Sequence, residues 1–104
     1  MNSLEHQETV LNIRYDLPSN VLDKLAHVYE KQDGWIGYGE DGRGQLGIPY
    51  WFSTSNNEKT VMASVEPGGL QISALMEDKD WENWIAEFKE IATEILGFKV
   101  LEIG

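Results

Sequence analysis

Hydrophobic and polar positions alternate in the stretch "TVLNIRYDL", which starts at Thr9. This period of two predicts a half-buried strand. Its apolar positions fall on one side: Leu11, Ile13 and Tyr15. The residues before this stretch are mostly polar, and we predict that residues 1–8 form a disordered N-terminus. Residues 9–104 then form a single domain, which is the size expected for a chain of 104 residues.

The hydrophobic spacing changes to a helical period at two places. The first helix follows Pro18, has Ser19 or Asn20 as its cap, and runs to about Gln32. Asp33-Gly34 ends it. Its apolar positions are Val21, Leu22, Leu25, Val28 and Tyr29.

The second helix begins near Asp78 or Asp80, both of which suit a helix cap. Gly97 is placed to end it in a left-handed conformation, with Phe98 folding back onto the helix. Its apolar stripe consists of Trp81, Trp84, Ile85, Phe88, Ile91, Ala92 and Ile95.

Between the helices, "KTVMASVEPGGLQISALM" predicts a β-hairpin. Pro67-Gly68 suits the centre of a type II turn, with Glu66 opposite Gly69. This register places six apolar residues on one face in three pairs: Val65 with Leu70, Ala63 with Ile72, and Val61 with Ala74. Tight hairpins prefer other turn types, so a wider or bulged loop stays an alternative.

Shorter stretches complete the sheet. "WIGY" and "IPYWFSTS" predict two strands before the hairpin, and "FKVLEI" predicts a final strand after the second helix. Because consecutive strands pair antiparallel, we predict an α+β fold of two layers, with a mainly antiparallel sheet of about five strands. The element order is β-α-β-β-β-β-α-β, with both helices on one face.

Five glycines fall between Gly34 and Gly44, and three of them spell G-x-G-x-x-G: Gly37, Gly39 and Gly42. A dinucleotide-binding loop must lead from a strand into a helix, whereas "RGQLGIPYWF" has no helical period. The carboxylates of Glu40 and Asp41 would also repel a phosphate. We therefore expect no nucleotide here, and interpret the glycines as turns or as a surface loop.

The aromatic residues around this loop have two interpretations. A small domain needs large side chains in its core, and some of these rings must serve there. The others could form a partner surface, because Trp and Tyr are enriched in interface hot spots. The residues in question are Trp35, Tyr38, Tyr50 and Trp51.

Composition narrows the class of partner. The net charge is −10, from 18 acidic and 8 basic residues, so nucleic acid and anionic membranes are excluded as partners. Cysteine is absent, the first residues lack a signal-peptide pattern, and no apolar stretch is long enough to span a bilayer. These features favour a cytoplasmic protein.

The acidic residues are concentrated near the end of the chain. Residues 77–104 carry eight acids and three lysines. On the second helix, Glu87, Glu90 and Glu94 align opposite the apolar stripe. They form either a solvated face or a preformed acidic ridge that speeds the capture of a basic protein.

We find no pattern for catalysis or for a metal. A zinc site needs about four ligands in a compact arrangement, and the only histidines are His6 and His27, each of which we interpret as a surface residue. The serines lack a G-x-S-x-G nucleophile elbow, and "GEDGRG" lacks the spacing of a calcium loop. We predict no catalytic residue and no cofactor, and do not expect an enzyme.

The stretch "YWFSTSNNEKTVMASVEPGGLQIS" followed by "DWENWIAEFKEIATEILGFKV" resembles the small immunity proteins that bacteria encode beside polymorphic or contact-dependent toxins. The resemblance covers residues 34–104 and includes no catalytic motif. It implies direct binding to a cognate toxin domain, for example a nuclease with a basic active-site groove.

Two other functions stay open. One is a small enzyme or ligand-binding domain with a cleft near the Gly-rich 34–47 loop, and the other is a dimerising adaptor. For the leading function we expect a monomer or weak dimer that binds a basic toxin domain. The candidate contact residues are Trp35, Tyr38, Glu40, Asp41, Trp51, Glu87, Glu90 and Glu94.

Overall fold

The computed structural model describes residues 4–40, 46–55 and 57–103. Its elements follow the predicted order, and the α+β class is confirmed. The elements are β1 (Glu5–Leu11), α1 (Ser19–Leu22), α2 (Leu25–Lys31), β2 (Trp35–Glu40), β3 (Leu46–Trp51), β4 (Thr60–Glu66), β5 (Gly69–Met76) and α3 (Asp78–Leu96).

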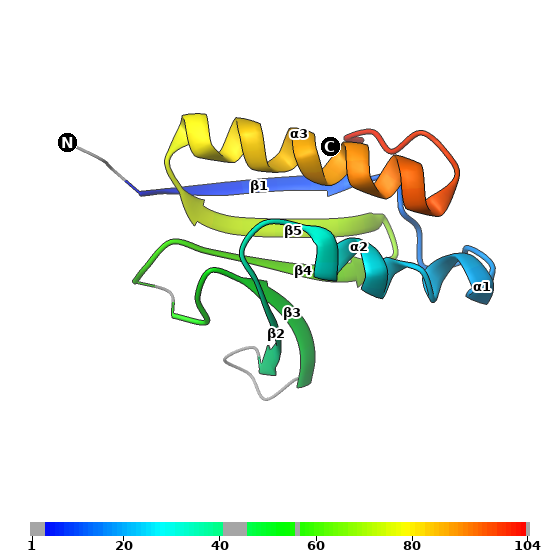
Figure 1. Cartoon of the computed structure of the whole chain (residues 1–104), viewed down its shortest axis with the longest axis horizontal. Coiled ribbons are helices and arrows are strands. Elements are labelled where there is room, and N and C mark those ends of the chain that lie inside the picture. Colours follow the sequence, from blue (N-terminus) through cyan, green and yellow to red (C-terminus); the bar gives the residue numbers. More distant parts are fainter. Residues whose placement is uncertain (1–3, 41–45, 56, 104) are drawn as a thin grey trace.

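The five strands form one open sheet in the order β1-β5-β4-β3-β2, and every neighbouring pair is antiparallel. In Figure 1, α3 runs along β1 and β5, and α2 lies closer to the β2 side. Residues of α2 and α3 pack into one core cluster with residues of the sheet. The molecule therefore has the predicted two layers, with β1 and β2 as the edge strands.

The first strand begins earlier than the sequence indicated. Glu5 pairs with Met76 and Leu11 pairs with Leu70, so residues 5–8 belong to the sheet. The prediction of a disordered N-terminus was wrong for these residues, whereas residues 1–3 lie outside the described part of the chain. An edge strand has neighbours on one side only and tolerates polar residues, which is why hydrophobicity did not mark its start.

The β4–β5 hairpin has the predicted register, including all three apolar pairs and the pair of Glu66 with Gly69. The predicted turn type was wrong. A type II turn needs a positive φ at Gly68, but the positive φ, 139°, is at Gly69. Gly69 also lies against β1, where a Cβ atom would come within 2.2 Å of the Leu11 carbonyl oxygen. The close approach of β1 thus explains why a glycine is needed at position 69.

The first predicted helix is divided into α1 and α2 by Asp23 and Lys24. Pro18 occupies the position before the first helical residue, and no side chain caps α1. Ser19 lies inside the helix, so neither Ser19 nor Asn20 acts as the predicted cap. The helical apolar spacing still holds in α2, which buries Leu25, Val28 and Tyr29.

α3 begins at Asp78 as predicted, but the residue before it is Glu77, whose side chain makes no capping bond. Asp78 and Asp80 lie in the first turn, where negative charge interacts favourably with the helix dipole. Gly97 ends the helix with φ 87°, as predicted, and Phe98 packs against the core. No helix in the described ranges is long and apolar enough to cross a membrane.

The predicted final strand is reduced to a single antiparallel bridge between Leu11 and Glu102. The N–H of Ile103 donates to the Val10 carbonyl at 2.8 Å. The Asn12 side chain binds this segment twice, donating to the Lys99 carbonyl at 3.0 Å and accepting from the Leu101 N–H at 2.8 Å. The last described residues therefore cover one end of the β1 edge.

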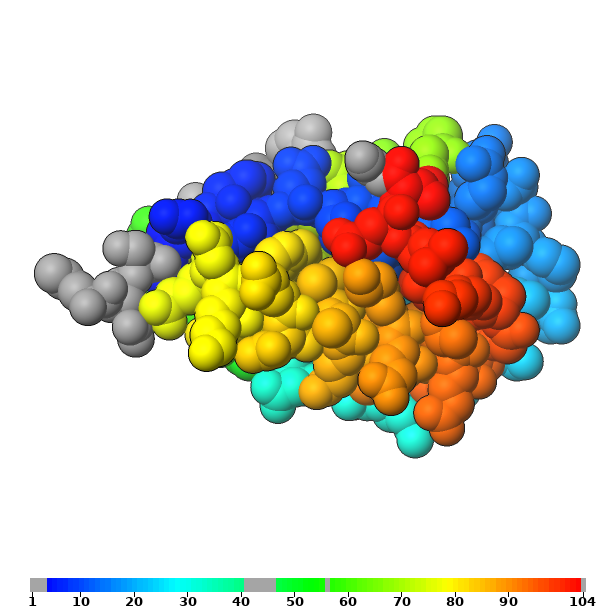
Figure 2. Space-filling model, turned by 90° about the horizontal axis from the view of Figure 1, so that it is seen from above, coloured from blue at the N-terminus to red at the C-terminus, as the bar shows by residue number. Residues whose placement is uncertain are grey.

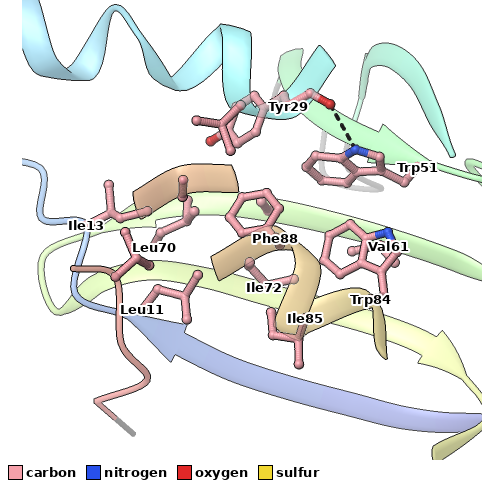
Figure 3. Packing of buried hydrophobic residues seen from close by; sticks show 14 of the residues in the cluster. Leu11, Ile13, Tyr29, Trp51, Val61, Leu70, Ile72, Trp84, Ile85 and Phe88 are labelled. Atoms are coloured by element: carbon pink, nitrogen blue, oxygen red, sulfur yellow. Dashed lines mark hydrogen bonds between the residues drawn. The ribbon is translucent and has the colours of Figure 1, made fainter. Parts of the chain in front are cut away.

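Aromatic rings dominate the centre of the core (Figure 3). Trp51 is fully buried, and its indole N–H donates to the Tyr29 carbonyl at 3.1 Å. The rings of Trp84 and Phe88 meet it from α3, with centroids 5.2 Å and 6.0 Å away. Gln32 is buried too and donates from Nε2 to the Trp84 carbonyl at 3.0 Å. These bonds hold α2, α3 and β3 together.

Candidate protein-binding surface

The exposed side of α3 carries the three aligned glutamates. Glu87, Glu90 and Glu94 are all exposed, whereas the opposite side of the helix buries Trp84, Phe88 and other apolar residues. Figure 2 looks down on α3, whose residues occupy the middle of that face of the molecule. We call Glu87, Glu90 and Glu94 the α3 ridge. The predicted alignment opposite the apolar stripe is confirmed, and its binding role stays a prediction.

A second feature lies on the edge strand β2. Ile36 is 52% exposed and Tyr38 is 54% exposed, which is high for such apolar side chains, and Trp35 is half-buried beside them. Ile36 falls at an irregularity in the pairing of β2 with β3, between Trp35 and Gly37. We call the contacting residues Trp35 and Tyr38, together with the exposed Ile36 between them in the sequence, the β2 patch. Two of the predicted contact residues, Trp35 and Tyr38, therefore lie together.

Ring contacts connect the β2 patch to the core. Tyr38 meets Trp35 at a centroid distance of 5.1 Å and an interplanar angle of 80°, and Trp35 stacks on Tyr29 at 6.1 Å. Trp35 also meets Trp51 at 5.5 Å. Because Trp51 has no exposed surface, the prediction that it contacts a partner was wrong. Trp51 instead packs against Trp35 from the core, and its own ring is held in place by the hydrogen bond to the Tyr29 carbonyl.

Charge around Tyr38 is negative. Partial burial raises the pKa of the Tyr38 hydroxyl, and the carboxylate of Glu30 raises it further. Burial likewise raises the pKa of Tyr29 well above its ordinary value, with a smaller effect from Tyr38. Glu30 is an exposed residue of α2. Sequence reasoning missed it because only the fold brings the end of α2 beside β2.

The remaining predicted residues lie at the end of β2. Glu40 is exposed, and its backbone carbonyl accepts a hydrogen bond from the Tyr50 hydroxyl at 2.9 Å. Asp41 lies outside the described residues. The next element of the described chain after β2 is another strand, β3, whereas a dinucleotide-binding loop leads into a helix.

A small cleft lies beside the first half of α3, and Glu87 of the α3 ridge is one of its lining residues. Its volume is about 160 Å³, and its lining is polar except for Phe52, Met76 and Trp84. Three carboxylates line it: Asp33, Asp80 and Glu87. Lys59 lies 4.3 Å from the centre of the Phe52 ring and 3.9 Å from Asp80, and thus supplies a positive charge of its own.

The backbone of Phe52 has a φ of 71°, a value that residues other than glycine rarely adopt. Two contacts hold it there. The Phe52 N–H donates to the Gly34 carbonyl at 2.7 Å, and the ring covers Gly34, where a Cβ atom would come within 2.5 Å of it. The Trp84 indole N–H binds the neighbouring Asp33 carbonyl at 3.0 Å. Gly34 is therefore needed here because the Phe52 ring packs directly on its backbone.

The far end of the α3 ridge is less uniform in charge. Glu90 and Glu94 line a shallow groove of about 500 Å³ together with Lys89 and Lys99. Lys89 binds Glu102 at 2.9 Å, so its charge is already compensated.

The described residues contain no cluster of three or more His, Asp and Glu side chains that could hold a metal ion. Both histidines are exposed, as expected, and His6 lies 3.5 Å from Glu8. The cleft beside Gly34 is smaller than the 300 Å³ or more that is typical of small-molecule sites.

The sheet face away from the helices has one apolar hollow of about 180 Å³. Its lining residues are His6, Thr60, Met62, Ser73, Ala74 and Leu75. Such a hollow is what a dimerising adaptor would offer a second copy. It is shallow, however, and the β2 patch exposes larger apolar and aromatic side chains.

Comparison with protein-family models gave no matching family, and searches of curated proteins and of solved structures gave no similar chain. The surface must therefore be interpreted from its own chemistry.

Proposed function

We propose that this protein is a binding protein of the immunity type, which neutralises a cognate bacterial toxin in the cytoplasm by direct contact. The observation that carries the proposal is the α3 ridge, three exposed glutamates on the side of α3 that faces away from the core. Each of the three is free of a salt bridge to any described residue, so the ridge keeps its charge for a partner.

Charge of this kind acts mainly on the rate of association. A net charge of −10 attracts a basic protein from a distance, and complementary potentials orient it before contact. A toxin that cleaves nucleic acid has a positive groove for its substrate. An acidic protein uses the same field, and its binding over or beside that groove excludes the nucleic acid.

Slow dissociation needs desolvated anchors in addition to charge. Exposed aromatic side chains serve this purpose in protein interfaces, because they bury a large area with little loss of rotational freedom. The β2 patch supplies Trp35 and Tyr38 for it, with Ile36 adding apolar area. The proposed protein needs no catalytic residue and no cofactor of its own.

Co-expression with the basic toxin domain encoded by an adjacent reading frame tests the proposal. We expect protection of the host from that toxin, and a one-to-one complex whose association slows as salt is added. The triple substitution E87K/E90K/E94K should slow association by at least about tenfold. Association rates at several salt concentrations provide the measurement.

A matched variant separates local contact from overall charge. E5K/D23K/E66K makes the same change in net charge at three exposed positions away from the α3 ridge. It should retain most of the association rate. Equal effects of the two triple variants would show that only net charge matters, and a toxin that is neither bound nor neutralised would refute the proposed function.

A further inference from the structure

The β2 patch is the largest exposed aromatic feature at a sheet edge in the described chain. β2 is the last strand of the sheet, and its only strand neighbour is β3. Tyr38 is 54% exposed although its ring is held against Trp35. An apolar and aromatic surface this open on an edge strand is typical of an interaction site.

We propose that the β2 patch binds one arginine or lysine side chain of the partner, with the cation against the Tyr38 ring and Glu30 as its counter-charge. This inference rests on the proposed function and adds the anchoring contact and its chemistry. The occupant is a basic segment of another protein. The α3 ridge would then attract the partner, and the β2 patch would hold it.

The rings are preorganised for this contact. Trp35 meets Tyr38 nearly at right angles and stacks on Tyr29, whose carbonyl is in turn bound to the buried Trp51. Tyr38 is therefore held by a chain of contacts that reaches the core. A ring that is already fixed loses little freedom on binding, and cations are attracted to the faces of such rings within about 6 Å.

Glu30 gives the patch its sign. It lies near the end of α2, a helix that contacts β2, and its carboxylate raises the pKa of the Tyr38 hydroxyl. A negative charge at this place favours a cation beside the ring. Glu40, at the end of β2, is a second exposed acid on this strand. Lys31 follows Glu30 in α2, but the charge that raises the pKa of the Tyr38 hydroxyl is that of Glu30.

The molecule already uses this type of contact elsewhere. Lys59 lies over the Phe52 ring at 4.3 Å, beside the carboxylate of Asp80. Among the described residues, no cation occupies the corresponding position over Tyr38 or Trp35. Within the described residues, a lysine thus lies over the Phe52 ring, which has an acid beside it, and no cation lies over the Tyr38 ring.

A second copy of the chain is a poorer occupant than a basic segment. Pairing two β2 patches would bring Glu30 and Glu40 of both copies together, and each copy carries a net charge of −10. Like charges brought into an interface oppose association. Charge complementarity therefore selects a basic partner for this surface.

The test is an NMR titration of the full chain with the end-blocked peptide Gly-Arg-Gly-Arg-Gly. The control peptide has citrulline in place of arginine, which keeps the shape and removes the charge. We expect the Trp35 indole and Tyr38 ring signals to shift with the arginine peptide and to shift little with the citrulline peptide. The indole signals of Trp51 and Trp84, which bind backbone carbonyls, report that the fold is intact.

Variants assign the contact to individual groups. Tyr38→Ala should weaken peptide binding about fivefold, whereas Tyr38→Phe keeps the ring and should bind nearly as well as the wild type. Glu30→Gln should weaken binding about threefold. The control is Tyr15→Ala, because Tyr15 is also exposed but lies in the β1–α1 connection, and its removal should change nothing.

Three results would overturn the inference. The first is shifts confined to the α3 ridge, which would leave the proposed function intact. The second is binding that is insensitive to Tyr38→Ala in a folded protein. The third is a concentration-dependent change of the patch signals without peptide, which would identify a second copy as the occupant. Toxin neutralisation is measured separately, so its absence alone would refute the proposed function.

Discussion

The backbone of Gly69 lies against Leu11 so closely that a Cβ atom on Gly69 would come within 2.2 Å of the Leu11 carbonyl oxygen. Gly69 also has φ 139°, which an alanine rarely adopts. We therefore expect Gly69→Ala to lower the free energy of unfolding by more than about 2 kcal/mol. Urea unfolding followed by tryptophan fluorescence measures the change.

The neighbouring Gly68 is the matched control. No atom lies within 4 Å of a Cβ placed on it, and its φ is not in the positive range. Gly68→Ala should be neutral, or should stabilise the fold by up to about 1 kcal/mol through the unfolded chain. A Gly69→Ala protein as stable as the wild type would contradict the close contact between β1 and β5.

Trp51 should behave as a core residue. Trp51→Phe removes the indole that binds the Tyr29 carbonyl and leaves a small void between β3 and α3. We expect a loss of about 2 kcal/mol in the free energy of unfolding. The same substitution at half-buried Trp35 should cost less, and equal losses at the two positions would contradict their different burial.

Alanine substitutions at Gly34 and Gly37 distinguish the cost of backbone strain from the cost of a side-chain clash. Both have a positive φ, 90° and 123°, so alanine is strained at either position. Only at Gly34 would the added Cβ meet a side chain, the Phe52 ring at 2.5 Å. Gly34→Ala should thus be less stable than Gly37→Ala by about 1 kcal/mol, as measured by thermal or urea unfolding. The reverse order would show that Phe52 moves away without cost.

Glu102 should make a pH-dependent contribution to stability. Hydrogen bonds from Thr9, at 2.6 Å, and from Lys89, at 2.9 Å, lower the pKa of its carboxyl group. The folded state therefore releases this proton at a lower pH than the unfolded state. The contribution is present above the unfolded pKa, about 4.3, and is lost as the pH falls through the lower folded pKa.

The measurement compares the wild type with Glu102→Gln by urea unfolding from pH 7 downwards. The wild type should be more stable by about 0.5 kcal/mol at neutral pH, because the pair lies at the surface. The difference should vanish in acid. Thr9→Val removes the hydrogen bond that lowers the Glu102 pKa most and should reduce the pH dependence, whereas a difference that grows in acid would contradict the assignment.

The hairpin could be predicted in detail from the sequence. Val61, Ala63 and Val65 pair with Ala74, Ile72 and Leu70, and a slip by one residue would set this apolar row against the polar Gln71 and Ser73. The turn type could not be predicted, because it depends on how closely β1 approaches Gly69. Local pattern determines the register, but contacts with a third strand determine the turn.

The candidate site was predicted in part. The spacing of Glu87, Glu90 and Glu94 fixed their common side on α3, since helical geometry alone decides it. The sequence could not separate Trp35 from Trp51, because both occupy predicted strands and their burial depends on how α2 and α3 cover the sheet. Glu30 was missed for the same reason, as its nearness to Tyr38 is created by the fold.

Both sides of β5 are occupied within the sheet, by β4 on one side and by β1 on the other. β5 is also the strand whose core-facing residues are all apolar: Leu70, Ile72, Ala74 and Met76. Proteolytic trimming of the first eleven residues would thus convert an interior strand into a bare hydrophobic template for strand addition. The short β1 segment thus covers a strand edge that would otherwise be open to pairing with another chain.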